Sequence, residues 1–364
     1  MPSLNSSALY ITLFLVLGCT GQVDPYESIF GAFKTSKWIH IHLTDSKYKD
    51  IAPDSYSILQ DDAFATSSYH VIDMKDSLMA VADGFKTIKS IDPITGQVLR
   101  EHLFEGKGPR EYTFITDMLS DRSHMLIVDG PAFKVIRFEN SFNEFDEFVI
   151  PDFNPLRKVD YRYPYFIYSA SADEDYTMSI RNLDASTERS FHPLIIPRGQ
   201  QPSGYNSTIP SISPNNDVAL LSLNMPFLFI YHDVFRRNET HPDIAIRLHH
   251  EELVMVGKPT KYSMGGLDNP PPTVMESYAG QTIGYSPVFS DIVFNDPWIF
   301  IRQQPENRLL VLRRENESFT HHGSYRLLDA KGDAVSFGDL TYSHPWLYMG
   351  SKLGILKMNI NVLN

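Results

Sequence analysis

The sequence predicts an all-β fold, namely a six-bladed β-propeller in which an N-terminal strand closes the last blade. Three observations lead to this prediction. A short apolar run, a turn of Asp, Asn, Gly or Pro and a second apolar run recur six times, and strong helical periodicity is absent after the first strand. A content of 42% hydrophobic and 21% charged residues is that of a globular protein with a full core.

The first 18 residues are predicted to be an export signal. Ala8 to Cys19 is an apolar run that ends in the only cysteine and is too short to span a bilayer, which takes about 20 residues. Val16, Leu17, Gly18 and Cys19 resemble the lipobox of bacterial lipoproteins, in which lipid is attached to the cysteine and the preceding peptide is removed. No Lys or Arg precedes the apolar run, unlike in most signal peptides. The alternative is a buried N-terminal strand with an inert thiol.

Residues 19–35 are polar and punctuated by Gly and Pro, which indicates a tether. The propeller is predicted over residues 36–364. Its first segment, Trp38 to Leu43, alternates with a period of two, which is typical of a half-buried strand. The last repeat ends too early to supply an outermost strand, so we expect Trp38 to Leu43 to pair with the final blade and remove an open sheet edge. The alternative is an added N-terminal hairpin.

The six repeats are recognised by apolar runs that we take as the first strands of the blades. Anchored on one residue in each run, they are separated by 48, 40, 53, 80 and 48 residues, and blades typically repeat at about 40 to 50. The anchors are Leu78, Leu126, Phe166, Ala219, Ile299 and Leu347. The long interval contains a Gly- and Pro-rich stretch at about 257–287. Because three consecutive prolines, Pro270 to Pro272, cannot occupy a central strand, it is predicted to be an inserted loop.

A loop between the first two repeats reads Gly106-Lys107-Gly108-Pro109-Arg110-Glu111-Tyr112. It resembles the G-x-G-P-x-E-aromatic signature of six-bladed propeller lipoproteins of Gram-negative bacteria, often described as TolB-like. Most members of that family have no established activity, so the resemblance implies the fold more than a function. Gly106, Gly108 and Pro109 are predicted to shape the backbone of the loop.

Three hypotheses compete for this loop. A phosphate cradle would need a helix after Tyr112, and no helical pattern follows. A ligand contact beside the central channel would use the charges of Lys107, Arg110 and Glu111. An interblade turn, in which Glu111 satisfies backbone amides, is the favoured alternative. Exposed aromatic rings could also grip a sugar or peptide, and Tyr163 and Tyr285 are the tentative candidates.

The histidine pairs do not predict a metal site. His40 and His42 lie on one face of a predicted strand, but their spacing alone matches no known ligand pattern. His249 and His250 are adjacent and would point to opposite sides of a strand. We therefore predict no metal and no cofactor, with a structural or channel-bound divalent ion left as the alternative.

The sequence also lacks a recognisable catalytic set. Asp291 and Asp296 flank the start of the fifth blade and could face the channel, as ligands do in some six-bladed lactonases, but the Glu and Asn partners of such a site are not identifiable. Asp83 and Asp129 occupy equivalent positions before glycines, which argues for turn caps. A G-x-S-x-G nucleophile motif is absent, and the lipidated cysteine cannot serve as a nucleophile.

The expected function is a ligand-binding or protein-interaction scaffold in the cell envelope, and the sequence favours a binding protein over an enzyme. The expected partners are a membrane, through the lipid on Cys19, and a protein, peptide or glycan at a propeller face. A net charge of -12 disfavours nucleic acid. We expect the outer membrane, with the periplasmic side favoured. The alternative function is a metal-dependent hydrolase or lyase that acts on a carbohydrate or lactone at the channel.

Overall fold

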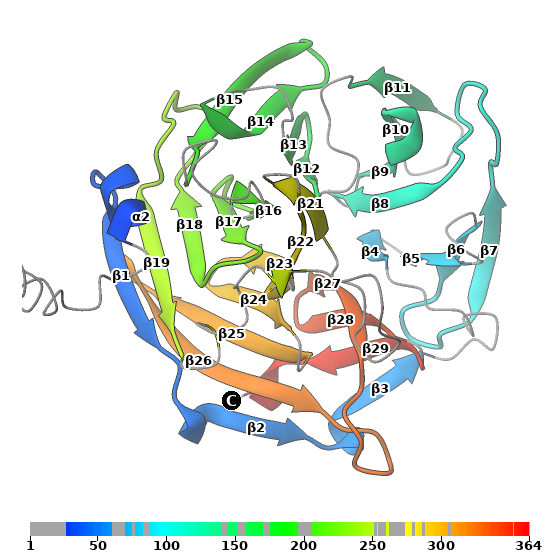
Figure 1. Cartoon of the computed structure of the whole chain (residues 1–364). Helices are drawn as coiled ribbons and strands as arrows, with labels where there is room; N and C mark the ends of the chain where they lie inside the picture. Colours follow the sequence, from blue (N-terminus) through cyan, green and yellow to red (C-terminus); the bar gives the residue numbers. More distant parts are fainter. Residues whose placement is uncertain are drawn as a thin grey trace, which may run out of the picture.

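The structure is a computed structural model in which six β-sheets surround a central channel (Figure 1). It describes residues 27–363 except for 60–69, 75–76, 83–86, 122, 140–143, 151–157, 170–174, 196–205, 251–252, 254–259, 262–273, 279–280, 286–287, 305–306 and 352. The signal and lipobox predictions, Cys19 included, lie outside these residues. No helix in the described part of the chain is long and apolar enough to cross a bilayer.

Each blade is an antiparallel sheet that is numbered here from its innermost strand. Blades 1 to 3 consist of β4 (Val71–Met74), β5 (Ser77–Ala82), β6 (Thr87–Ile91) and β7 (Val98–Leu103); β8 (Ile115–Ser120), β9 (His124–Asp129), β10 (Lys134–Glu139) and β11 (Phe145–Val149); and β12 (Asp160–Arg162), β13 (Tyr165–Ser169), β14 (Tyr176–Asn182) and β15 (Thr187–Pro193). Blades 4 to 6 consist of β16 (Thr208–Ile212), β17 (Val218–Ser222), β18 (Phe227–Tyr231) and β19 (Ile244–His249); β23 (Phe289–Asn295), β24 (Trp298–Gln303), β25 (Arg308–Glu315) and β26 (Ser318–Leu327); and β27 (Phe337–Ser343), β28 (Trp346–Ser351) and β29 (Gly354–Asn359).

The six runs that anchor the sequence repeat are therefore the second strands of the blades, not the first. A shorter strand precedes each of them and lines the channel. These innermost strands escaped the sequence analysis because they are short and carry polar residues, so they lack the apolar runs that mark the strands behind them.

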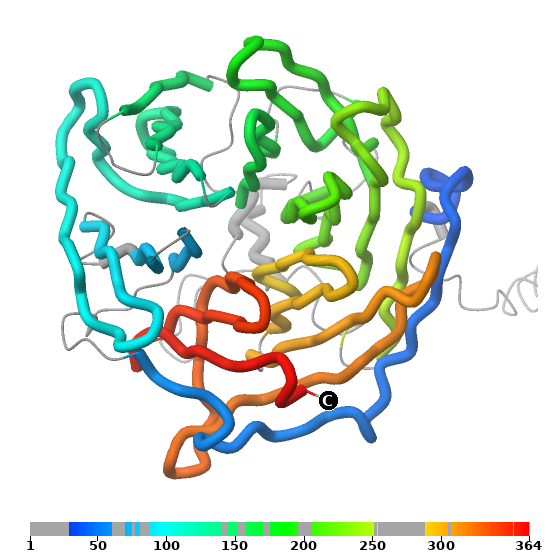
Figure 2. Tube along the Cα trace, turned by 180° about the vertical axis from the view of Figure 1, so that it is seen from behind, coloured from blue at the N-terminus to red at the C-terminus, as the bar shows by residue number. Residues whose placement is uncertain are grey.

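The N-terminal segment supplies three strands that run along the outer edges of three successive blades (Figures 1 and 2). β1 (Lys37–His42) pairs with β19 in parallel, and β2 (Tyr48–Ile51) pairs with β26 in parallel. β3 (Tyr56–Leu59) pairs antiparallel with β29 and completes blade 6. An N-terminal strand thus closes the last blade as predicted, but the assignment of Trp38 to Leu43 to that role was wrong. Those residues form β1 and extend blade 4 instead.

The tether also ends earlier than the sequence suggested. The helix α2 (Glu27–Ala32) and the residues after it pack on the propeller, where the side chains of Ile29 and Phe33 are buried in the cluster between blades 3 and 4. The residues predicted to form the inserted loop contain a small sheet of β20 (Thr260–Lys261), β21 (Val274–Tyr278) and β22 (Gln281–Tyr285). β21 and β22 project over the middle of the ring in Figure 1.

The hydrophobic core is divided into six clusters, one at each interface between adjacent blades. All five side chains of β17 and all five of β18 are buried, because each blade is covered on both faces by its neighbours. The last interface, between blades 6 and 1, includes Leu59 from β3 and Ile355 from β29. The closing strand thus adds both backbone pairing and apolar contacts to the join.

We predict that the closing strand is a strong contributor to stability. Tyr56 of β3 is 8% exposed, and its hydroxyl donates a hydrogen bond of 2.8 Å to the carbonyl oxygen of Leu328. Tyr56→Ala should lower the free energy of unfolding by about 3 kcal/mol, as expected for a large buried side chain. Tyr56→Phe loses only the hydrogen bond and should cost about 1 kcal/mol.

Urea unfolding of both variants measures these differences. The exposed neighbour Ser57 provides the control, because Ser57→Ala removes little contact area from the same strand. Equal effects of Tyr56→Ala and Ser57→Ala would contradict the role assigned to β3.

Candidate functional site

One polar residue near the start of each innermost strand forms a ring around the channel. We call this set the channel ring. It consists of His70, Asp117, Asp160, Ser211, Asp291 and Asp339. His70 directly precedes β4, and the other five lie in β8, β12, β16, β23 and β27. Because the innermost strands repeat around the ring, side chains at equivalent positions come to the same depth in the channel.

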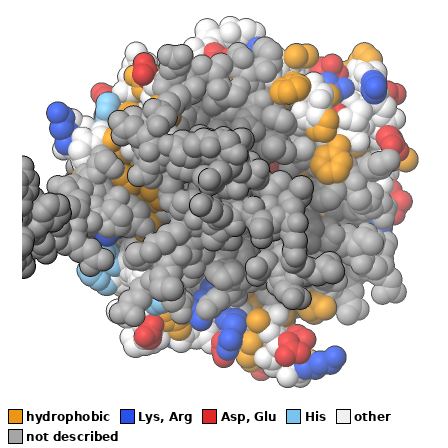
Figure 3. Space-filling model, viewed as in Figure 1, with side chains coloured by type: hydrophobic (Ala, Val, Ile, Leu, Met, Phe, Trp, Pro, Cys, Tyr) orange, Lys and Arg blue, Asp and Glu red, His pale blue; other side chains and the backbone are white. Residues whose placement is uncertain are grey.

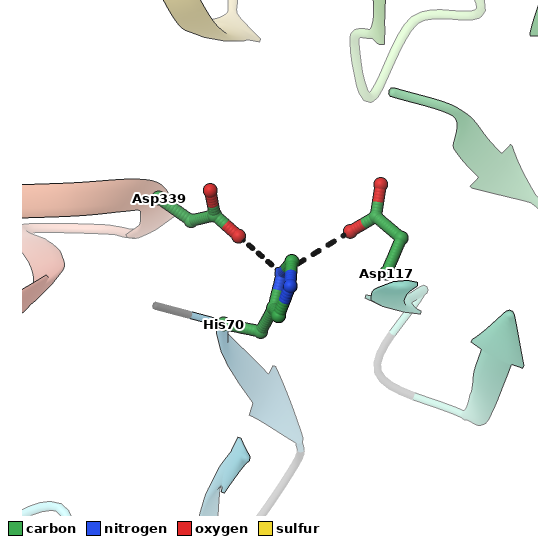
Figure 4. A group of neighbouring side chains, drawn as sticks. All are labelled: His70, Asp117 and Asp339. Atoms are coloured by element: carbon green, nitrogen blue, oxygen red, sulfur yellow. Dashed lines mark ion pairs between the residues drawn. The ribbon is translucent and has the colours of Figure 1, made fainter. Parts of the chain in front are cut away.

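The channel ring connects each blade to the next. Four of its side chains accept a hydrogen bond from a backbone N–H of the following blade: Asp117 from Val159 (3.4 Å), Asp160 from Ile212 (2.5 Å), Ser211 from Phe294 (2.9 Å) and Asp291 from Leu340 (2.6 Å). His70 completes the circle, because Nδ1 forms ion pairs with Asp339 of blade 6 and Asp117 of blade 2 (Figure 4). The ring therefore satisfies buried amides at successive blade interfaces.

Lys158 closes the channel at the level of the ring. It stands just before β12 of blade 3, and its Nζ lies 2.5 Å from Oδ1 of Asp339 and 3.9 Å from Oδ1 of Asp291. Blades 3 and 6 lie on opposite sides of a six-membered ring, so the Lys158–Asp339 pair spans the channel. Four carboxylates and two cationic groups, Lys158 and His70, are thus gathered in one buried cluster.

The cluster perturbs the pKa values of its members. Burial raises the pKa of Asp160 to about 7 and, against the pull of Lys158, the pKa of Asp291 to about 6. Burial also raises the pKa of Asp117. For Asp339 burial is outweighed by Lys158 and His70, which hold its pKa well below the usual range. Burial disfavours the ammonium of Lys158, yet the surrounding carboxylates raise its pKa.

A cavity of about 480 Å³ extends from the channel ring to the far ends of the innermost strands. Its deep end includes Asp117, Asp160, Asp291, Asp339 and Lys158. The residues at the other end come from the last positions of the innermost strands and the turns after them: Asp73, Asp121, Arg162, Asn295, Tyr342 and His344. His344 is exposed, so the cavity reaches the surface at this end.

Three members of the ring have the donor atoms of a metal site. The described residues contain one group of at least three His, Cys, Asp or Glu ligand atoms within 4.8 Å of one another, and it consists of His70, Asp117 and Asp339. His70 Nδ1 lies 3.5 Å from Oδ1 of Asp117 (Figure 4). One nitrogen and two carboxylate oxygens suit Zn²⁺ or Mn²⁺ better than an all-oxygen cation site would.

The loop of residues 106–112 does not line this cavity. The carboxylate of Glu111 accepts a hydrogen bond of 2.7 Å from the N–H of Gly108, and a Cβ at Gly106 would lie 2.0 Å from Oε2 of Glu111. Lys134 of β10 donates to the carbonyl oxygens of Gly108 and Glu111. These are the contacts that the interblade-turn hypothesis expects, and they explain why the position of Gly106 excludes a side chain.

The charged candidates of that loop point to other partners. The guanidinium of Arg110 lies 4.5 Å from the ring centre of Phe104, and its backbone N–H is 3.3 Å from Oε2 of Glu147. Lys107 is likewise absent from the residues that line the channel cavity. A ligand contact of Lys107, Arg110 and Glu111 beside the channel therefore lacks support in the geometry.

The two aromatic candidates have different outcomes. Tyr163, 47% exposed, follows β12 directly; its ring stacks on His124 and its N–H donates to Asp121, which lines the cavity. Tyr163 thus lies near the cavity mouth. Tyr285 is the last residue of β22, and its side chain lies outside the described residues.

Among the carboxylates weighed from the sequence, Asp291 faces the channel and Asp129 caps a turn. Asp129 accepts hydrogen bonds from the N–H groups of Ala132 and Thr113. Asp296 instead lies 3.7 Å from Arg314 in a surface cluster between blades 4 and 5. The equivalent Asp83 lies outside the described residues.

Comparison with known proteins supports the fold. No family model and no curated protein matches the chain. A putative exported protein from Bacteroides fragilis is similar, with a TM-score of 0.52 and 10% identity over 86% of this chain and 88% of that one. The WD40 repeats of RRP9 give a TM-score of 0.50 and 9% identity over 85% and 99%. These likenesses show a propeller fold alone, and the TolB-like lipoprotein family stays a resemblance.

We predict that Lys158 is required to hold the buried carboxylates together. Lys158→Met keeps much of the apolar stem but leaves Asp339 and Asp291 without their ammonium, so the free energy of unfolding should fall by about 3 to 5 kcal/mol. Chemical denaturation measures the change. The exposed Lys331→Met variant serves as the control, and an equal, small effect of both substitutions would contradict the prediction.

We also predict a pH-dependent effect at Asp160. Its pKa is about 7 in the folded state against an ordinary 3.8, so the folded chain holds a proton that the unfolded chain has already lost. Its burial therefore costs stability increasingly as the pH rises from about 4 to 7, by up to about 4 kcal/mol. Asp160→Asn cannot ionise and should gain stability relative to the wild type over that range.

Urea unfolding at about pH 4.5, 6 and 7.5 tests this effect. Asp160→Ser cannot ionise either and should show the same trend relative to the wild type, although its absolute stability will differ. Stability differences that stay constant with pH for both variants would show that Asp160 does not titrate as predicted.

Proposed function

We propose that this chain is a lipid-anchored propeller of the cell envelope that binds a ligand in its channel cavity and performs no covalent chemistry. The observation that carries the proposal is the cavity of about 480 Å³, which is polar, open at one end and floored by the charged channel ring. Pockets of this volume are in the range that holds small ligands or the end of a larger one.

The state of the ring carboxylates argues for binding over catalysis. Asp160 and Asp291 each accept a short hydrogen bond from a backbone N–H of the next blade, and Asp339 is paired with Lys158 and His70. A general base needs a lone pair directed at its substrate, whereas these oxygens hold the blades together. The ring thus provides a rigid, charged floor for recognition.

The charge of the floor indicates the class of ligand. Its four carboxylates exceed its two cationic groups, so it favours groups that donate hydrogen bonds or carry positive charge. Tyr342 lines the cavity, and the exposed ring of Tyr163 lies near its mouth, which suits the flat faces of a sugar ring or an aromatic side chain. We therefore propose a glycan with amino groups or a peptide amine as the ligand.

Binding can be tested by calorimetry with amino sugars, neutral oligosaccharides and short basic peptides as probes. The mature protein should bind one of the donor-rich classes, and Tyr342→Ala should weaken that binding at least about tenfold through loss of the ring contact. Asp54→Asn, on the outer edge away from the cavity, should leave the affinity unchanged. Absence of binding to every class, or equal binding by Tyr342→Ala, would overturn the proposal.

The anchor is tested independently in cells. Cys19 should incorporate labelled palmitate and hold the protein in the membrane fraction, and Cys19→Ser should abolish both. Retention of the label by Cys19→Ser would remove the anchor from the proposal but leave the cavity unaffected.

A second candidate function is metal-dependent hydrolysis or elimination of a carbohydrate or lactone. The convergence of His70, Asp117 and Asp339 favours it, because these residues could hold a divalent ion at the floor of the cavity. Such an enzyme would turn over lactone or uronate substrates only with added Zn²⁺ or Mn²⁺ and would lose turnover in His70→Ala. Ligand binding without turnover under these conditions would exclude the second candidate.

A further inference from the structure

Three histidines lie together on the outer edge of blade 4, far from the channel. His40 and His42 are two residues apart in β1, so their side chains leave the same face of the strand. β1 runs parallel to β19, and His42 is the register partner of His249. Figure 3 shows histidine side chains at the edge of the molecule where Figure 1 places β1 and β19.

The three imidazoles are close enough to share a ligand. Nδ1 of His40 lies 2.8 Å from Nε2 of His249. The ring of His249 is flanked by both others, with ring centres 5.1 Å from His40 and 4.6 Å from His42. Two nitrogens bound to one tetrahedral Zn²⁺ at about 2.0 to 2.1 Å would lie about 3.3 Å apart, so a small separation of the His40 and His249 rings makes room for an ion.

We propose that His40, His42 and His249 form a binding site for a transition-metal ion of the Zn²⁺, Cu²⁺ or Ni²⁺ class. Imidazole nitrogens select these ions over Ca²⁺ and Mg²⁺, which take oxygen ligands. Two histidines two apart on one strand and a third on the neighbouring strand place three donors on one side of a sheet. The fourth coordination position faces solvent, because His40 and His42 are both exposed, and it is open to water or an external ligand.

The surroundings of the cluster are compatible with a bound cation. Arg247, the register partner of His40, has its guanidinium 5.5 Å from the ring centre of Phe30. Phe30 in turn stacks near His40, with ring centres 6.1 Å apart, and so supports one side of the imidazole. The aromatic contact therefore places the positive charge of Arg247 against a ring face.

The site joins two distant parts of the chain. His42 and His249 are paired only through β1 and β19, and β1 follows directly on the segment that leads from the membrane anchor. A bound ion would fasten this N-terminal strand to blade 4 and oppose its detachment. The site is separate from the channel cavity, so it does not depend on the proposed ligand.

Calorimetric titration of the mature protein with ZnCl₂ tests the proposal, with Co²⁺ absorption as a second readout. The wild type should bind one Zn²⁺ at this site and give the intense visible bands of four-coordinate Co²⁺. His42→Ala and His249→Ala should each weaken Zn²⁺ binding at least about tenfold, since each removes one of three protein ligands. Ca²⁺ and Mg²⁺ should produce no heat from this site.

His250→Ala is the matched control. His250 is adjacent to His249 but turns to the other side, where Nε2 lies 3.4 Å from Asp45, so its removal should leave Zn²⁺ affinity unchanged. Circular dichroism verifies that each variant is folded. Absence of Zn²⁺ binding by the wild type, or unchanged binding by folded His42→Ala and His249→Ala, would overturn the proposal. Zn²⁺ binding lost only in His70→Ala would also overturn it and assign the ion to the channel.

Discussion

The hydrogen bonds of the channel ring are the contacts on which the geometry of the channel depends. Each blade interface is held behind the channel by apolar side chains, which are tolerant of small sliding movements because dispersion contacts have little directionality. A carboxylate that accepts a backbone N–H from the next blade is directional and allows one alignment. Asp160 with Ile212 and Asp291 with Leu340 thus align successive innermost strands. The cavity inherits its shape from that alignment.

The concentration of carboxylates required for this purpose has an electrostatic consequence. Four buried acids cannot all be ionised without cations nearby, and the chain supplies Lys158 across the channel and His70 at the join of blades 6, 1 and 2. The same arrangement that holds the ring together leaves a charged floor at the base of an open cavity. Structure and recognition are therefore properties of one set of residues, and substitutions in the ring will affect both.

The outer edge of the propeller is organised by a different constraint, namely the need to cover open sheet edges. β1, β2 and β3 follow one another along blades 4, 5 and 6, so a single N-terminal segment protects two edges and completes a third sheet. This route brings His40 and His42 beside His249. The histidine cluster is thus a consequence of how the ring is closed, and it lies in the part of the molecule that is nearest in sequence to the predicted anchor.

The sequence alone determined the fold class, the number of blades and the shortage of an outermost strand in the last repeat, because buried strands such as Val218–Ser222 require apolar runs wherever they lie in space. It left the innermost strands hidden, although Asp117, Asp291 and Asp339 each follow a small residue or threonine, precede an apolar one and stand eight or nine positions before the repeat anchors. Only the tertiary structure decided that these residues form a ring with Lys158. It also decided that β3, and not β1, closes blade 6. The physical reason is that pairing between strands distant in sequence depends on which edges are open in the assembled ring, and local patterns carry no information about that.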